Sequence, residues 1–95
     1  RLHCDPSDEA FLPDVMRNVT LTEWRPGLCR LRAETDGDVG ALLYGLCLKA
    51  TLRLNADIHG LAAHTGRRGG WVSVYLSLPK GLGLDEAREI AEGWG

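Results

Sequence analysis

The sequence has no excess of basic residues: 11 Lys and Arg stand against 13 Asp and Glu, for a formal net charge of −2. A nucleic-acid-binding protein usually presents a strongly basic surface, so we do not expect nucleic acid as a partner, although a local basic patch is compatible with this balance. No apolar run approaches the ~20 residues of a membrane-spanning helix, and no signal peptide is recognisable. We therefore expect a cytoplasmic protein that has no membrane partner.

Closely spaced cysteines are also lacking. The three cysteines, Cys4, Cys29 and Cys47, are odd in number and far apart, so reduced thiols are expected rather than disulfides or a zinc site. His59 and His64 are five residues apart on an expected strand, which would place them on opposite faces and prevent a shared metal. No serine stands in a nucleophile elbow, and no acid pair recurs at catalytic spacing. We expect no catalytic residue, no metal and no cofactor.

The apolar pattern divides the chain into a short extension and one domain. Residues 1–18 are expected to form an N-terminal extension with short helical turns, and residues 19–95 the domain. Within the domain, alternating apolar residues indicate strands and helical spacing indicates helices. The expected strands are residues 19–24, 28–34, 56–64 and 71–78, with a basic loop at 65–70, and the expected helices are residues 39–54 and a last helix capped by Asp85.

The order of these elements predicts the fold. From the second strand onward, β-α-β-β-α is the order of a ferredoxin-like split βαβ unit without its final strand. The strand at 19–24, joined to the next by a tight turn at 25–27, would occupy the place of the missing strand. We therefore predict an α+β fold in which a four-stranded antiparallel sheet carries both helices on one face.

The predicted helix at 39–54 is apolar on two sides. One side would face the sheet, and the second side consists of Ala41, Tyr44, Gly45, Leu48 and Leu52. A helix that is apolar on two sides is buried on two sides. Two interpretations stay open: Tyr44, Leu48 and Leu52 pack against another helix of the domain, or they contact a second subunit.

The predicted sheet face that carries no helix is rich in aromatic and basic residues. Such a patch usually marks an interface, so we expect a protein partner there, unless the N-terminal segment covers it. Stacking nucleic acid on aromatic residues is a less favoured alternative, because the aromatic pattern of RNA-recognition domains is absent. The residues expected on this face are Thr20, Thr22, Trp24, Arg30, Arg32, Trp71, Ser73 and Tyr75.

A turn with two aspartates and two glycines joins the second strand to the first helix; we call residues 36–42 the Asp/Gly turn. The N–H groups at a helix N-terminus favour an anion. A ligand carboxylate would therefore meet the N–H groups of the four residues from Val39 to Leu42, which include Gly40 and Ala41. A ligand amine would suit the carboxylate of Asp36 or Asp38. Alternatively, Asp38 is only the helix cap and Asp36 only a turn residue.

Two further charged pairs have alternative interpretations. Asp57 and His59 share a face of their expected strand, so the carboxylate could orient the imidazole, although a polar surface or a subunit contact is the commoner meaning. Arg67 and Arg68, flanked by glycines, could bind phosphate, although two arginines in a loop are usually solvated.

Three short segments within residues 28–78 form a recognisable pattern. They are Gly40-Ala41-Leu42-Leu43-Tyr44-Gly45-Leu46, Asn55-Ala56-Asp57-Ile58-His59 and Val72-Ser73-Val74-Tyr75. Together they resemble the ACT domain, a small ligand-sensing regulatory module, and in particular the ACT modules at the end of nitrogen-sensing uridylyltransferases. The sequence departs from that family where Val39 replaces a proline, where Gly37 replaces an aspartate, and where the final strand is absent.

The resemblance implies a non-enzymatic regulatory module that acts as a homodimer and binds an amino acid at the subunit interface. It implies a site in which the Asp/Gly turn of one subunit meets Asn55, Asp57, Ile58 and His59 of the other. The alternatives are a docking module that uses Trp24, Arg30, Arg32, Trp71 and Tyr75 on the open sheet face, and a subunit of an enzyme whose active site lies elsewhere.

Overall fold

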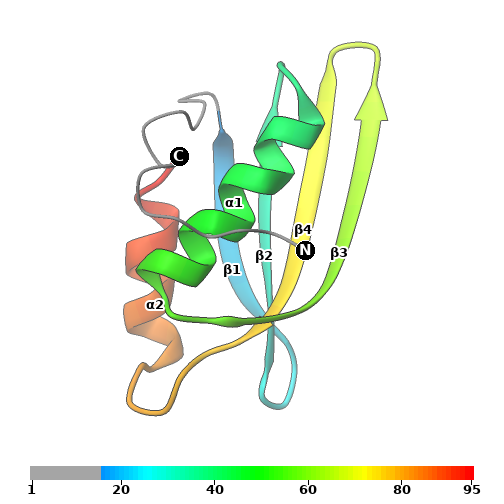
Figure 1. Ribbon diagram of the computed structural model, residues 1–95. Coiled ribbons are helices and arrows are strands. Elements are labelled where there is room, and N and C mark those ends of the chain that lie inside the picture. Colours follow the sequence, from blue (N-terminus) through cyan, green and yellow to red (C-terminus); the bar gives the residue numbers. More distant parts are fainter. Residues whose placement is uncertain (1–15) are drawn as a thin grey trace.

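The computed structural model describes residues 16–95, and the helical turns expected within residues 1–15 lie outside this range. Figure 1 shows two helices and four strands, of which the first begins two residues earlier than expected. The strands are β1 (Arg17–Arg25), β2 (Leu28–Thr35), β3 (Asp57–Gly66) and β4 (Gly69–Ser77), and the helices are α1 (Val39–Arg53) and α2 (Leu84–Glu92).

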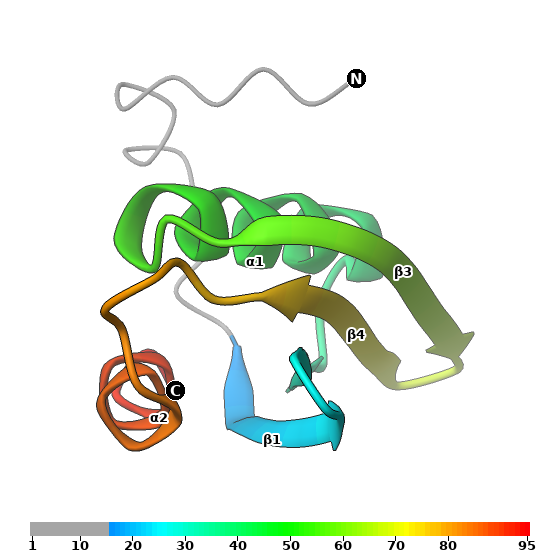
Figure 2. The same cartoon turned by 90° about the horizontal axis from the view of Figure 1, so that it is seen from below.

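The strands form a four-stranded antiparallel sheet in the order β1-β2-β4-β3. Because β4 lies between β2 and β3, α1 connects two strands that are not neighbours, as a split βαβ unit requires. Both helices lie on the same side of the sheet (Figure 2) and contribute to one core. The predicted α+β arrangement is confirmed, and it is consistent with a ferredoxin-like fold in which β1 supplies the edge strand beside β2.

The apolar side chains that alternate along the strands meet the helices in that core. Leu31 of β2 and Val74 of β4 are fully buried, and they lie directly opposite each other in the sheet. Leu46 of α1 and Ala87 of α2 are fully buried in the same core. Burying a leucine or valine side chain stabilises a fold by about 1.5–3 kcal/mol, so this alternation fixes which face of each strand turns inward.

Two of the cysteines belong to the core. Cys29 and Cys47 are buried free thiols. Burial, and secondly the charge of Glu23, raises the pKa of the Cys29 thiol. Cys29 is therefore protonated at neutral pH and behaves as a small apolar side chain.

Both hairpins turn tightly at a glycine. Gly27 follows Pro26 with φ +79°, as in a type II turn. Between β3 and β4 the turn contains only Arg67 and Arg68, and Gly69 follows with φ +90°, as in hairpins with a glycine bulge. The turn predicted at 65–70 is therefore present but shorter than expected, because Gly66 and Gly69 pair with each other and continue the strands.

Asn55 lies one residue beyond the C-cap of α1. Leu54 is the C-cap, and Asn55 follows with φ +52°, a left-handed conformation that asparagine tolerates. The N–H of Ala56 then donates to the carbonyl of Ala50 at 3.2 Å. This hydrogen bond closes the end of α1, and the chain continues directly into β3.

The start of α2 differs from the prediction. Its N-cap is Gly83, which makes no side-chain hydrogen bond, and Asp85 lies within the first turn instead of capping the helix. The Asp85 carboxylate forms an ion pair with Arg88 at 3.3 Å and suits the positive end of the helix dipole. A carboxylate in the first turn thus replaces the expected cap.

The two edges of the sheet differ. At the β1 edge, Arg88 Nε of α2 donates to the carbonyl oxygen of Leu21 at 2.9 Å. The N–H of Leu21 donates to the Glu92 carboxylate at 3.5 Å. Helix α2 therefore covers the free backbone groups of Leu21, whereas no described element lies beyond β3 (Figure 1).

Replacing Arg88 with alanine should lower the free energy of unfolding by about 1–2 kcal/mol, because a part-buried carbonyl loses a charged hydrogen-bond donor. Urea denaturation measures this change. Glu89→Ala is the matched control, since Glu89 is an exposed residue of the same helix. Equal losses in the two variants would contradict a specific role for Arg88 at the β1 edge.

Candidate functional site

The Asp/Gly turn is held by hydrogen bonds of its own residues. The side chain of Asp38 caps α1 by accepting from the N–H of Gly40 at 2.8 Å and of Ala41 at 3.3 Å. The N–H of Leu42 donates to the backbone carbonyl of Asp38 at 3.0 Å. Asp38 therefore occupies the place expected for a ligand carboxylate, as the alternative interpretation anticipated.

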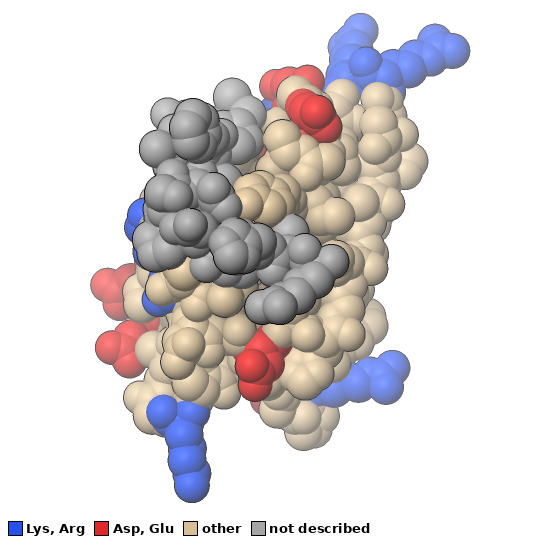
Figure 3. All heavy atoms as spheres, in the orientation of Figure 1, with Lys and Arg blue, Asp and Glu red and all other residues tan. Residues whose placement is uncertain are grey.

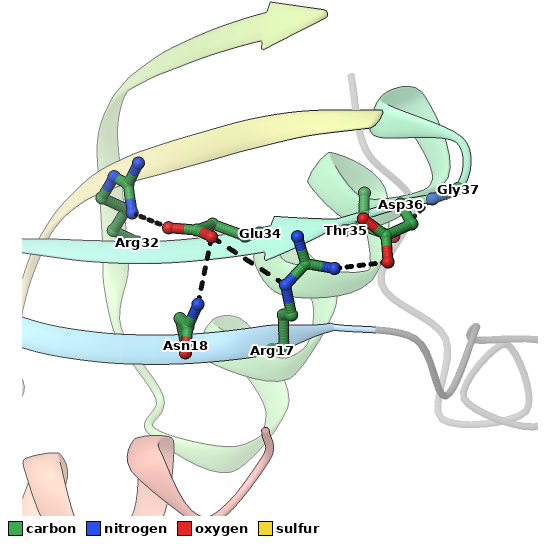
Figure 4. A network of polar contacts seen from close by, with 7 residues as sticks. All are labelled: Arg17, Asn18, Arg32, Glu34, Thr35, Asp36 and Gly37. Carbon is green, nitrogen blue, oxygen red and sulfur yellow. Dashed lines mark hydrogen bonds and ion pairs between the residues drawn. The ribbon is translucent and has the colours of Figure 1, made fainter. Parts of the chain in front are cut away.

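Before the cap, a buried threonine and an ion pair fix the turn. The N–H of Gly37 donates to the hydroxyl of Thr35 at 3.0 Å, and Thr35 is 1% exposed. The carboxylate of Asp36 accepts from Arg17 of β1 at 2.6 Å, which raises the pKa of the arginine. Asp36 is thus more than a turn residue, because it connects the turn to the edge strand (Figure 4).

Glu34 is the centre of this polar network (Figure 4). Its carboxylate accepts from Arg32 at 2.6 Å and from the Asn18 amide at 3.1 Å, and Arg17 Nε lies 4.0 Å away. The hydrogen bond from Arg32, followed by that from Asn18, lowers the pKa of Glu34. The network therefore ties β1 to β2 at the end of the sheet where α1 begins.

Within one chain, the two halves of the site that the resemblance implied lie apart. The Asp/Gly turn precedes α1, and Asn55 follows its C-cap. A helix of 15 residues separates its ends by about 22 Å, at 1.5 Å per residue. Asn55 and Asp57 are exposed, and Ile58 is half-buried against the core. One chain alone does not bring Asp36 and Asp57 together.

A bulge in β3 changes which face its histidines occupy. The register shifts between Ile58 and Gly60, and His59 is the additional residue. His59 Nε2 lies 2.8 Å from the hydroxyl of Ser77, while His64 stacks on Trp71 with ring centroids 6.0 Å apart. Both histidines therefore lie on the open sheet face, and the prediction of opposite faces was wrong because an inserted residue reverses the alternation.

The open face carries two clusters of aromatic and basic residues. Trp24 meets Tyr75 edge to face at 5.6 Å between centroids, and the Arg30 guanidinium lies 5.4 Å from the Trp24 ring. Arg32 lies 5.3 Å from the Trp71 ring. Trp24 is 47% exposed, whereas Ser73 is buried between its neighbours. The sequence placed these residues on one face correctly.

The second apolar side of α1 is largely covered. Leu48 is 1% exposed, and Tyr44 and Leu52 are half-buried. Leu48 therefore has almost no accessible surface, whereas Tyr44 and Leu52 keep part of theirs.

Arginines from three strands or turns line a hollow that the sequence did not reveal. We call it the arginine hollow; its volume is about 320 Å³, and it opens at the end of the sheet near the β3–β4 hairpin. Arg67 and Arg68 were the only signal, because Arg17 fell in the expected extension and Arg32 on the open face. The lining residues are Arg17, Arg32, Glu34, Thr35, His64, Gly66, Arg68, Gly69, Gly70 and Trp71.

Within residues 16–95, no three His, Cys, Asp or Glu side chains gather as a metal site would require. Neither α1 nor α2 is long and apolar enough to cross a membrane. Comparisons with family models, with curated proteins and with solved structures found no match for this chain. Its function is therefore inferred from the geometry of its own residues.

Glu34 should make the stability of the domain depend on pH. Its pKa is lowered in the folded state, so its contribution is fully present above the unfolded pKa and is lost as the pH falls through the folded value. Wild type should be more stable than Glu34→Gln at pH 7, and the difference should shrink at pH 3. Urea denaturation at both values tests this, and a difference that does not change with pH would contradict it.

Proposed function

We propose that the chain is an ACT-like regulatory module that forms a dimer through β3 and binds an amino acid between the two subunits. The single observation that carries the proposal is the difference between the two sheet edges. Residues of α2 cover β1 at Leu21, while β3 lies at the other edge, beyond which the described residues place no element.

The composition of β3 supports pairing with a second copy. Exposed edge strands usually carry lysine or proline, which discourage pairing with other chains. The ten residues of β3 include no lysine, arginine or proline. Leu61, at its centre, is 50% exposed. An edge without basic residues or proline and with an exposed leucine suits addition of another strand.

Pairing of two β3 strands about a twofold axis would complete the site. In an antiparallel pair, the start of one β3 lies beside the end of the other. The end of β3 pairs with the start of β4, where Gly66 lies opposite Gly69, and a Cβ atom built on Gly69 would come within 2.6 Å of the Cα atom of Asp36 in the Asp/Gly turn. Asn55 and Asp57 of one subunit would thus approach Asp36 of the other.

The charges at this junction suit an amino acid. The carboxylates of Asp36 and Asp57, from different subunits, would bind the ligand's ammonium group. Asp38 already occupies the N–H groups of Gly40 and Ala41, so the ligand carboxylate would take the N–H of Val39. A ligand bound in this way would stabilise the dimer, which is how a signal would reach an attached protein.

A docking module on the open face is the second candidate. It is favoured by one observation, the exposure of Trp24 beside Tyr75 and Arg30. A large exposed aromatic with an arginine is typical of a protein contact. If docking is the function, the chain alone sediments as a monomer and amino acids leave its melting temperature unchanged.

Replacing Leu61 with lysine should convert the dimer into a monomer, because a charge on the bare edge opposes strand pairing. Sedimentation velocity measures the change, and the melting temperature of the variant at low concentration should stay near that of wild type, since Leu61 is half exposed. Thr22→Lys is the matched control, as it places the same charge on the other edge strand. A wild-type monomer at all concentrations, or equal effects of both lysines, would refute pairing through β3.

Amino acids added one at a time should include one that raises the melting temperature of the dimer. At ~100 times its Kd, a ligand stabilises the folded state by ~2.7 kcal/mol. Asp57→Asn should lose the response while keeping the dimer, because only a carboxylate contact is removed. Leu61→Lys should also lose it, because each site needs two subunits. If no amino acid shifts the wild-type melting temperature, the sensing function is excluded and the fold is unaffected.

A further inference from the structure

We propose that the arginine hollow is a binding site for a small phosphate monoester, separate from the amino-acid site. Three arginines line it, and with the Glu34 carboxylate of the lining and the Asp36 carboxylate that pairs with Arg17 the local charge is +1. A phosphate monoester carries about −1.5 to −2 charges at pH 7, opposite in sign to the lining. A volume of about 320 Å³ falls in the range of small-molecule pockets, so the hollow admits a short organic group with the phosphate.

Two of the arginines are held in place by carboxylates. Arg32 pairs with Glu34, and Arg17 pairs with Asp36, each at 2.6 Å (Figure 4). A guanidinium has five N–H donors, and each of these ion pairs uses only some of them. The remaining donors can bind phosphate oxygens while the carboxylates keep both side chains oriented, which lowers the entropy lost on binding.

Arg68 supplies the charge that is not neutralised. Within the described part of the chain it forms no ion pair, unlike Arg17 and Arg32. Figure 3 shows basic side chains extending into solvent from the end of the β3–β4 hairpin, which contains Arg67 and Arg68. Of these two arginines only Arg68 lines the hollow. Because Arg68 has no ion-pair partner among the described residues, its guanidinium is available to bind an anion.

The backbone that carries Arg68 is fixed by glycines. A Cβ atom on Gly69 would lie 2.0 Å from the carbonyl oxygen of Thr35, and one on Gly70 would lie 1.8 Å from that of His64. Only glycine allows the hairpin to approach the end of β2 so closely. The position of Arg68 relative to Arg17 is therefore set by the sheet itself.

Trp71 forms the apolar wall of the hollow. Arg32 from β2 and His64 from β3 both contact its ring, at 5.3 and 6.0 Å from the centroid. Because these contacts come from the strands on either side of β4, the ring is already flanked and acts as a wall instead of a stacking platform. The hollow therefore selects its ligand by the phosphate group, and a compact organic group of the ligand packs against Trp71.

Glucose 6-phosphate, with glucose and glucuronate as matched ligands, tests the proposal by isothermal titration calorimetry on the full chain. Glucose 6-phosphate should bind, glucose should not, and glucuronate should bind at least tenfold more weakly because it carries a single charge. Arg68→Ala should weaken the affinity about tenfold or more, since one charged hydrogen-bond donor is lost. Arg67→Ala, a change in the same turn but outside the lining, should stay within about twofold of wild type.

Equal losses in Arg67→Ala and Arg68→Ala would overturn the site, since they would indicate attraction by the turn as a whole. If glucuronate bound as tightly as glucose 6-phosphate, the assignment of the ligand as a phosphate monoester would be overturned. An unchanged melting temperature of Arg68→Ala without ligand shows that its effect is on binding. None of these results depends on dimer formation or on the amino-acid response.

Discussion

The contact of Arg88 with the carbonyl oxygen of Leu21 decides how this sheet can be extended. Together with Glu92, it places α2 over the edge of the strand that precedes the split βαβ unit. An open sheet has two edges, and covering one of them leaves the other as the place where a strand can be added. Through this constraint, α2 leaves β3, on the far side of the sheet, as the edge that no described element covers.

The end of the sheet where α1 begins concentrates the charged side chains. Arg17, Arg32, Glu34 and Asp36 form a network that joins β1, β2 and the Asp/Gly turn. Asp38 caps the start of the helix, so the turn is held by hydrogen bonds of its own residues. The same network orients two arginines of the hollow, Arg17 and Arg32. One set of ion pairs thus supports both proposed binding sites.

The regular parts of the chain were predictable because their apolar residues repeat with the period of a strand or a helix. Val72, Val74 and Leu76 are all fully buried, as their alternation requires, and α1 begins at Val39 after the Asp38 cap. The errors occurred where one residue or one glycine changes the local geometry. The bulge at His59 reversed the faces of β3, and the glycines at 66 and 69 extended strands through an expected loop.

The candidate sites were predictable only in part, because a site depends on distances between segments far apart in the sequence. The sequence by itself determined the strand and helix order, the inward faces of β1, β2 and β4, and the Asp38 cap of α1, since these depend on neighbours within a few residues. Only the tertiary structure decided that Arg17 meets Asp36, that Arg68 lies near Arg32, and that α2 covers β1. Such pairings arise when the core closes, because burying the alternating apolar faces fixes the position of every polar residue between them.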